Sequence, residues 1–487
     1  MRGMRALLPA QGVLLLLTAC GTAEKQEPIT MSVVGTELAL PNPNKGPLSA
    51  PAKLLGNAVL QGLVAFDAGG QVEPALAERW IVTSDGLSYI FRIKEATWSD
   101  GRPVTSAEVA QSLRAHMTSG GRNPMRGLFS SVSAVIPMTG QVVEIRLRTP
   151  EPNFLQLLAH PEMAVTRSGL GSGPYWIHSR KDNVLRLRMV ADPSELPAEA
   201  GDQAEIQSTD VRIRSEGTAQ AAARFVANGS LYLTGGTFTD LPIANAANPD
   251  TTEFELDPAL GLFGLLAMQS DGIVADRDVR SAMSMAIERE TLLQNFGVRD
   301  WRTAISVLPL QMDSASPPAV IGTVQQPYRE RLLRARALVA GKSLETPVRV
   351  ALPAGPGARL LFAKLAADWR SIGIKAVRVG LGQKSDLRLI DEIAPYSSGL
   401  WYVRRLSCAP GALCSEEADS AVREAMASPD LASRSAGIAR ADAALTVSQN
   451  YIPLALPLRW SLVSAELTGW KPSAFANHPL RHLRPRK

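Results

Sequence analysis

The sequence has few of the residues that build metal centres. Among 487 residues it contains only three cysteines and five histidines. No histidine forms a ligand-spaced pair with a cysteine; the histidines are His116, His160, His178, His478 and His482. A zinc site needs several such ligands at close spacing. We therefore expect no metal site and no cofactor.

Long apolar runs are also missing, and the longest one stands at the N-terminus. Arg2 and Arg5 precede the run "GVLLLLTA", which is much shorter than the roughly 20 residues of a membrane span. A basic start, a short apolar run and small residues describe a secretory signal. We expect residues 1–19 to be that signal and residues 20–31 to be a polar tether.

The end of this signal, "LTAC" followed by Gly21, resembles a bacterial lipobox. The resemblance implies that Cys20 is acylated on sulfur and becomes the mature N-terminus. Two acyl chains anchor a protein stably where one would be marginal. The alternative is an ordinary signal peptide with an incidental cysteine.

The chain lacks a strong excess of either charge. It carries 51 basic and 46 acidic residues, and removing the signal leaves 49 basic residues. The basic residues are scattered, whereas nucleic-acid binders cluster them, so we expect no nucleic-acid partner. The C-terminal "LRHLRPRK" is a local basic patch: it is either a solvated terminus or a contact for anionic lipid headgroups.

Two cysteines remain besides Cys20. Cys408 and Cys414 flank "APGAL", whose Pro410 and Gly411 can turn the chain back on itself. An oxidising compartment favours a disulfide between them over two free thiols.

No catalytic motif emerges from the sequence. "SGLGSGPYW" is rich in glycine but leads into a predicted strand, which a dinucleotide or phosphate cradle does not. Ser172 lacks the spacing of a nucleophile elbow. We expect a protein that is not an enzyme.

Hydrophobic periodicity predicts a mixed α/β protein of more than one lobe, since 487 residues exceed one ordinary core. Alternation at 87–94 predicts a strand, and Thr105 with Glu108 forms a capping-box pattern before a helix at 106–117. Residues 266–455 alternate helix and strand, which favours a lobe with a largely parallel sheet.

Residues 62–113 resemble the signature of the family 5 extracellular solute-binding proteins, the peptide-type receptors of ATP-binding-cassette importers. "GSGPYWI", "DRDVRSAMSMAIERETLL" and "NYIPLALP" follow in the family's order. The matching positions of the signature are Pro74, Leu76, Ala77, Trp80, Asp85, Gly86, Tyr89, Phe91, Asp100, Gly101, Pro103, Thr105 and Val109.

The resemblance implies a two-lobed clamshell of the periplasmic-binding-protein type. Lobe I would comprise residues 32–53, 166–255 and 455–487, with 54–165 as an extra α+β subdomain. Lobe II would comprise residues 256–454.

The resemblance also implies a receptor that captures a small peptide or related solute and delivers it to a permease and its ATPase. We expect a monomer in the periplasm, held to a membrane by its lipid. Two other hypotheses stay open: a receptor-fold lipoprotein that acts as a sensor or scaffold without transport, and a periplasmic hydrolase.

The family places its ligand between the lobes, which implies two groups of site residues. The first group runs along the cleft and consists of Gly35, Thr36, Glu37 and Leu38. The second group lies in lobe II and consists of Trp401, Tyr402, Arg404 and the neighbouring Arg405. Glu37 is either a cation partner or a solvated strand end, and the two aromatic residues either line a groove or pack in the core.

The lobe II segment that contains Trp401 and Arg404 differs from the corresponding segment of peptide-binding family members. Peptide-binding members carry an Asp there that pairs with the peptide's α-ammonium, and no Asp stands between Pro395 and Cys408. A buried ammonium without a carboxylate is costly. The two arginines favour an anionic or carboxylate ligand, or else they are solvated surface residues.

Overall fold

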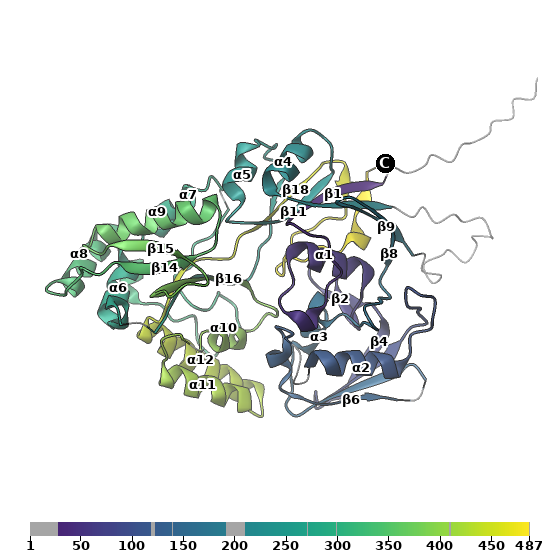
Figure 1. Ribbon diagram of the computed structural model, residues 1–487. Helices are drawn as coiled ribbons and strands as arrows, with labels where there is room; N and C mark the ends of the chain where they lie inside the picture. Colours follow the sequence, from purple (N-terminus) through teal and green to yellow (C-terminus); the bar gives the residue numbers. More distant parts are fainter. Residues whose placement is uncertain are drawn as a thin grey trace, which may run out of the picture.

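The computed structural model describes residues 28–117, 122–138, 140–190, 210–269, 271–298, 300–408 and 411–486. Two large sheets form two lobes, and a four-stranded sheet forms a smaller subdomain beside them (Figure 1). The predicted signal segment and Cys20 lie outside the described residues. The first strand, β1 (Ile29–Val34), already includes the end of the predicted tether.

Lobe I is built on a seven-stranded sheet in which β1 runs parallel to both of its neighbours. The helices α1 (Ala50–Val59), α4 (Thr218–Val226) and α5 (Leu241–Ala246) belong to this lobe. In spatial order the strands are β12 (Phe254–Leu256), β18 (Arg459–Val463), β11 (Tyr232–Thr237), β1, β10 (Val211–Glu216), β9 (Val184–Met189) and β8 (Tyr175–Lys181).

The accessory subdomain has an antiparallel sheet with one helix, α2 (Ser106–Met117), packed against it. The predicted capping box is confirmed, because Thr105 N donates to Glu108 Oε2 at 3.1 Å and Glu108 N donates to Thr105 Oγ1 at 3.3 Å. The other elements here are β2 (Val64–Phe66), β3 (Val72–Pro74), β4 (Ala77–Val82), β5 (Ser88–Ile93), β6 (Val132–Pro137), β7 (Val142–Leu147) and α3 (Phe154–Leu158).

Lobe II has a five-stranded sheet that is mixed, so the prediction of a largely parallel sheet is wrong. β14 pairs in parallel with β15 and β16, but β13 runs antiparallel to both β16 and β17. The interior strand β13, between β16 and β17, is buried along its whole length and was not predicted. In spatial order the strands are β15 (Ala376–Gly380), β14 (Val348–Leu352), β16 (Leu387–Ile393), β13 (Gly261–Ala267) and β17 (Tyr451–Ala455).

Helices surround this second sheet, and three of them face the accessory subdomain (Figure 1). The three are α10 (Gly399–Arg405), α11 (Glu416–Ala427) and α12 (Leu431–Ser448). The remaining helices are α6 (Arg277–Ala286), α7 (Arg289–Gln294), α8 (Tyr328–Val339) and α9 (Pro356–Arg370). The chain crosses from one large sheet to the other after β12 and returns between β17 and β18.

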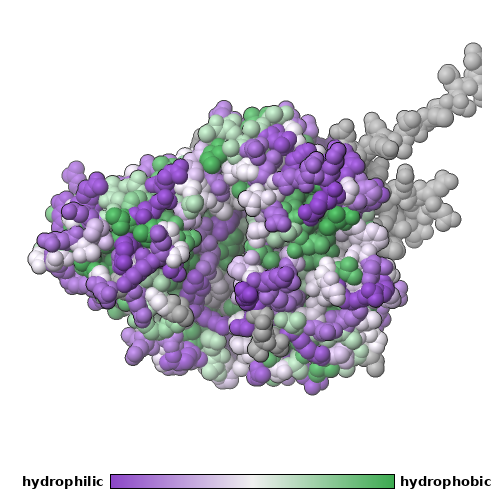
Figure 2. Space-filling model, in the orientation of Figure 1, coloured by the Kyte–Doolittle hydropathy of each residue, from purple (hydrophilic) through white to green (hydrophobic). Residues whose placement is uncertain are grey.

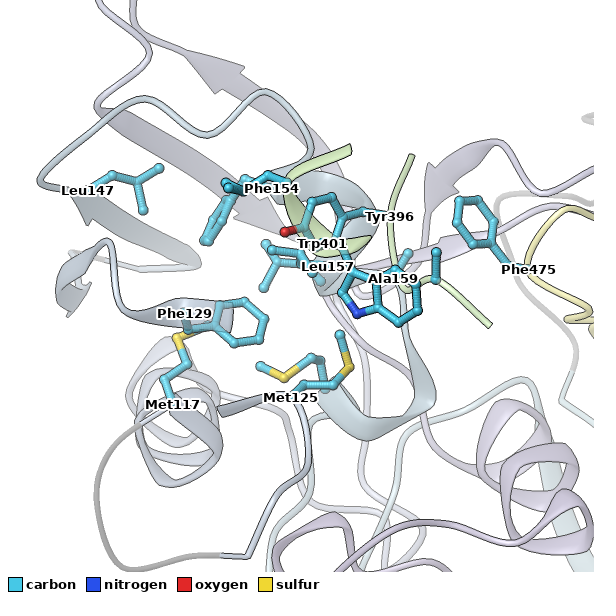
Figure 3. Close-up of a cluster of buried hydrophobic side chains, with 14 of the residues drawn as sticks. Met117, Met125, Phe129, Leu147, Phe154, Leu157, Ala159, Tyr396, Trp401 and Phe475 are labelled. Carbon is cyan, nitrogen blue, oxygen red and sulfur yellow. The ribbon is translucent and has the colours of Figure 1, made fainter. Parts of the chain in front are cut away.

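The accessory subdomain and lobe II share one apolar cluster (Figure 3). Tyr396 and Trp401 of lobe II lie against Met125, Phe129 and Leu157 of the subdomain. Trp401 is 6% exposed and Tyr396 is 3% exposed. Lobe II and the accessory subdomain are therefore in direct contact at this end of the molecule.

Candidate functional site

A cavity of about 830 Å³ lies where the two lobes and the accessory subdomain meet. Figure 2 shows the groove between the lobes, with hydrophilic side chains inside it. Lobe I contributes the segment 234–237 of β11 and the neighbouring β18, and lobe II contributes 391–393 and α10. The subdomain contributes 124–128 and 160–162. A cavity of this size can enclose a small solute.

Carboxylates line this cavity, and each has a basic partner within the protein. Glu162 pairs with Lys53 at 2.9 Å, and Glu392 pairs with Arg405 at 2.6 Å. The other two pairs are Asp391 with Arg459 at 2.8 Å and Asp257 with His478 at 3.0 Å.

Burial and neighbouring charge act against each other on these groups. Burial raises the pKa of Asp391, and the charge of Arg459 offsets this only in part. Burial also acts to raise the pKa of Glu162, but Lys53 and His160 outweigh it and the pKa is lowered. Burial lowers the pKa of His160 itself, whose Nε2 donates to Pro395 O at 2.6 Å.

Arg404 differs from the other cavity arginines. Its Nη2 donates to the carbonyl oxygen of Gly127 at 2.6 Å, a contact between lobe II and the accessory subdomain. Within the part of the chain that the structure describes, no carboxylate lies within 4.0 Å of its guanidinium. A guanidinium presents several donors in a planar fork, so Arg404 keeps donors that a ligand could use.

The predicted lobe II residues divide into three kinds. Trp401 and Arg404 line the cavity, and Trp401 also packs against the subdomain. Arg405 lines it too, but Glu392 holds its guanidinium. Tyr402 is fully buried and is not part of the cavity wall. It follows Trp401 directly on α10, so its ring leaves the helix on another side and packs edge-on at 4.9 Å from the Trp401 ring.

The segment Gly35–Thr36–Glu37–Leu38 is not brought to the cavity. The backbone N–H of Gly35 donates to Glu216 O, and Leu38 is buried in the core of lobe I. Thr36 and Glu37 are exposed. Val33 of β1, two residues before Gly35, does reach the cavity wall, as do Leu54 and Asn57 of α1.

The ion-paired residues of the wall were not predicted from the sequence. His478 and Asp257 lie more than two hundred residues apart in the chain, so no spacing rule could connect them. Asp391 and Glu392 have a weak sequence signal of a functional site, because they follow the mostly apolar first half of β16.

Three further findings concern the chain outside the cavity. Cys408 and Cys414 are joined in a disulfide, with 4.8 Å between their Cα atoms. Among the described residues, no group of three or more His, Cys, Asp or Glu side chains is arranged to hold a metal ion. None of the described helices has the length and apolar character needed to cross a bilayer.

Comparison with known families assigns the fold. The family model for bacterial extracellular solute-binding proteins, family 5 (middle region), matches residues 71–387. This chain belongs to that family. The sequence resemblance and the mixed α/β, two-lobed fold are thereby confirmed.

Curated relatives of the chain are binding proteins. The periplasmic oligopeptide-binding protein OppA of Escherichia coli K12 is 23% identical over 68% of this chain and 65% of its own length. The probable deoxycholate-binding periplasmic protein YgiS of the same strain is 28% identical over 22% of this chain and 23% of its own length. The matched stretches thus span less than two thirds of these relatives.

Solved structures agree over nearly the whole chain. Haemophilus influenzae OppA, in complex with RPPGFSPFR, superposes with a TM-score of 0.78 at 17% identity, covering 95% of this chain and all of the other. NikA from Brucella suis, in complex with Fe(III)-EDTA, superposes with a TM-score of 0.75 at 18% identity, covering 94% of this chain and all of the other. At such identity the likeness carries the fold alone.

Proposed function

We propose that this protein is the substrate-binding receptor of an ATP-binding-cassette importer. The observation that carries the proposal is the cavity of about 830 Å³ whose wall comes from both lobes and the subdomain. A ligand that touches both lobes stabilises the closed form through its differential affinity. Shifting a mostly open population to a mostly closed one takes about 5 kcal/mol of such affinity.

The ligand class follows from the charges of the wall. The carboxylates that line the cavity already have basic partners, so a free α-ammonium would have to compete with those partners for an acceptor. Arg404 is the arginine of the wall without a carboxylate among the described residues. We infer that the solute is anionic, or peptide-like with a carboxylate near Arg404, and that it lacks a buried primary ammonium.

A thermal-shift panel tests this ligand class. Acidic and N-acetylated peptides and small dicarboxylates should raise the melting temperature more than peptides with a free N-terminus. For a solute found in this way, Arg404→Gln should weaken binding roughly ten- to hundredfold, because a hydrogen bond to a charged group is lost. The exposed Arg440→Gln on α12 is the matched control. A solute that binds Arg404→Gln as tightly as the unaltered chain would remove Arg404 from the site.

The relatives support a position outside the cytoplasm, since OppA and YgiS are periplasmic proteins. We propose that acylated Cys20 tethers the body to a membrane there, next to a permease and its ATPase. Membrane fractionation of Cys20→Ser checks the tether: the variant should be released into the soluble fraction. A variant that stays with the membrane contradicts the anchor and leaves the receptor assignment intact.

A further inference from the structure

The strands β8, β9 and β10 carry a basic surface that the receptor function does not use. Leu185, Leu187, Val211 and Ile213 point to one side of the sheet and are buried in the core of lobe I. The opposite side carries a set of side chains that we call the arginine face: Trp176, Lys181, Arg186, Arg188, Arg212 and Arg214.

The strand register places these side chains side by side. Arg186 lies directly opposite Arg212, and Trp176 lies opposite Arg188. Like charges directly opposite each other on antiparallel strands destabilise the pairing. Among the described residues neither Arg186 nor Arg212 has an ion-pair partner, whereas Arg188 lies 3.6 Å from Asp210. The fold therefore keeps an unfavourable pair that an external anion would relieve.

Exposed cationic side chains and an exposed aromatic ring lie together on this face. Trp176 is 47% exposed on the edge strand, and Arg186 and Arg188 are exposed. Helix α4 packs on the sheet at β1 and β11, away from β8 and β9. An exposed tryptophan beside arginines matches the interfacial region of a bilayer, where aromatic rings sit at headgroup level and cations meet anionic lipids.

The chain geometry brings this face close to the N-terminal segment. Ile29 at the start of β1 pairs with Val211 of β10, in the row next to Arg212. Ile29 lies nine positions after Cys20 in the chain, a reach of at most about 30 Å. β8 and β9 lie at the opposite side of the molecule from α8 (Figure 1).

From these observations we propose that the arginine face is a docking surface for an anionic lipid membrane. It would hold lobe I flat on the bilayer from which the chain is tethered, with the cavity directed sideways. The arginine face consists only of residues that the structure describes. The proposal does not depend on which solute the cavity binds.

Vesicle flotation tests the proposal on the chain from residue 20 onward with Cys20→Ser, which keeps every described residue and removes the lipid. We expect it to bind vesicles of equal parts phosphatidylglycerol and phosphatidylethanolamine, to be released by high salt, and to ignore phosphatidylcholine vesicles. Arg186→Gln/Arg212→Gln should lower binding about tenfold or more. Arg186→Lys/Arg212→Lys should keep it.

The matched control is Arg329→Gln/Arg334→Gln, which removes two exposed arginines from α8. Equal losses in this control and in the β9–β10 variant would overturn the proposal, as would absence of binding by the unaltered surface. A further test concerns the segment 191–209, which contains five carboxylates and no basic residue and could itself neutralise the arginine face. Binding that appears only after those carboxylates become amides would make this segment the occupant and would also overturn the proposal.

Discussion

At the scale of single residues, one buried carboxylate outside the cavity has no basic partner among the described residues. Asp442 on α12 is 1% exposed, and its Oδ2 accepts a hydrogen bond from Ala319 N at 2.7 Å. Its Oδ1 has no partner among the described residues. Burial raises the pKa of Asp442 to about 6. Folding therefore makes this side chain easier to protonate than it is in the unfolded chain.

Asp442 should make stability depend on pH. Because the folded-state pKa lies above the unfolded value, its stabilising effect is complete below about pH 4 and is lost as the pH rises through about 6. Asp442→Asn should remove this loss and raise the free energy of unfolding at neutral pH by about 2–3 kcal/mol. Urea unfolding across this pH range measures the effect. The exposed Asp182→Asn at the β8–β9 turn is the control and should follow the unaltered chain.

At the scale of elements, the sequence predicted those helices and strands whose stabilising interactions lie within a few residues of one another. The cap of α2 is an example, because Thr105 and Glu108 lie three residues apart and recognise each other directly. Glu108 Oε2 also accepts from Trp98 Nε1 at 3.1 Å, which fastens the preceding turn to the helix. β13 was missed for the opposite reason: it is buried on both faces and lacks alternation.

The capping interactions should be measurable as stability. Thr105→Ala should lower the free energy of unfolding by about 1 kcal/mol, the ordinary cost of losing an N-cap side chain. Glu108→Ala should cost about 2 kcal/mol, since the Trp98 indole N–H and the Thr105 backbone N–H both lose their acceptor. Urea unfolding of the full chain tests both. Equal, negligible effects would show that the box contributes nothing.

At the scale of the whole molecule, lobe II and the accessory subdomain are held together by direct contacts. Trp401 and Tyr396 fill an apolar cluster with subdomain residues (Figure 3). Two hydrogen bonds also connect lobe II with the subdomain. Arg434 Nη2 donates to Pro150 O at 2.8 Å, and Ser397 N donates to Gln156 Oε1 at 3.0 Å. Closure thus gains free energy from the protein itself as well as from a ligand.

Removing the indole should open the clamshell. Trp401→Ala deletes a side chain buried between lobe II and the subdomain, so the ligand-free protein should shift toward an open form with a larger radius of gyration. Small-angle X-ray scattering measures this shift, and saturating solute should reverse part of it. Val447→Ala, exposed on α12, should leave the radius unchanged. An unchanged radius for Trp401→Ala would mean that the indole does not hold the lobes together.

The sequence by itself determined the family, the mixed α/β class and the local elements, because signature motifs, caps and hydrophobic periods act over a few residues. It also marked Trp401 and Arg404, which reach the cavity wall. Only the tertiary structure decided that Arg405 is held by Glu392, that Tyr402 is buried and that residues 35–38 do not line the cavity. The reason is physical: ion pairs such as Asp257–His478 join residues distant in the chain, and the direction of a side chain is fixed by the packing of whole elements.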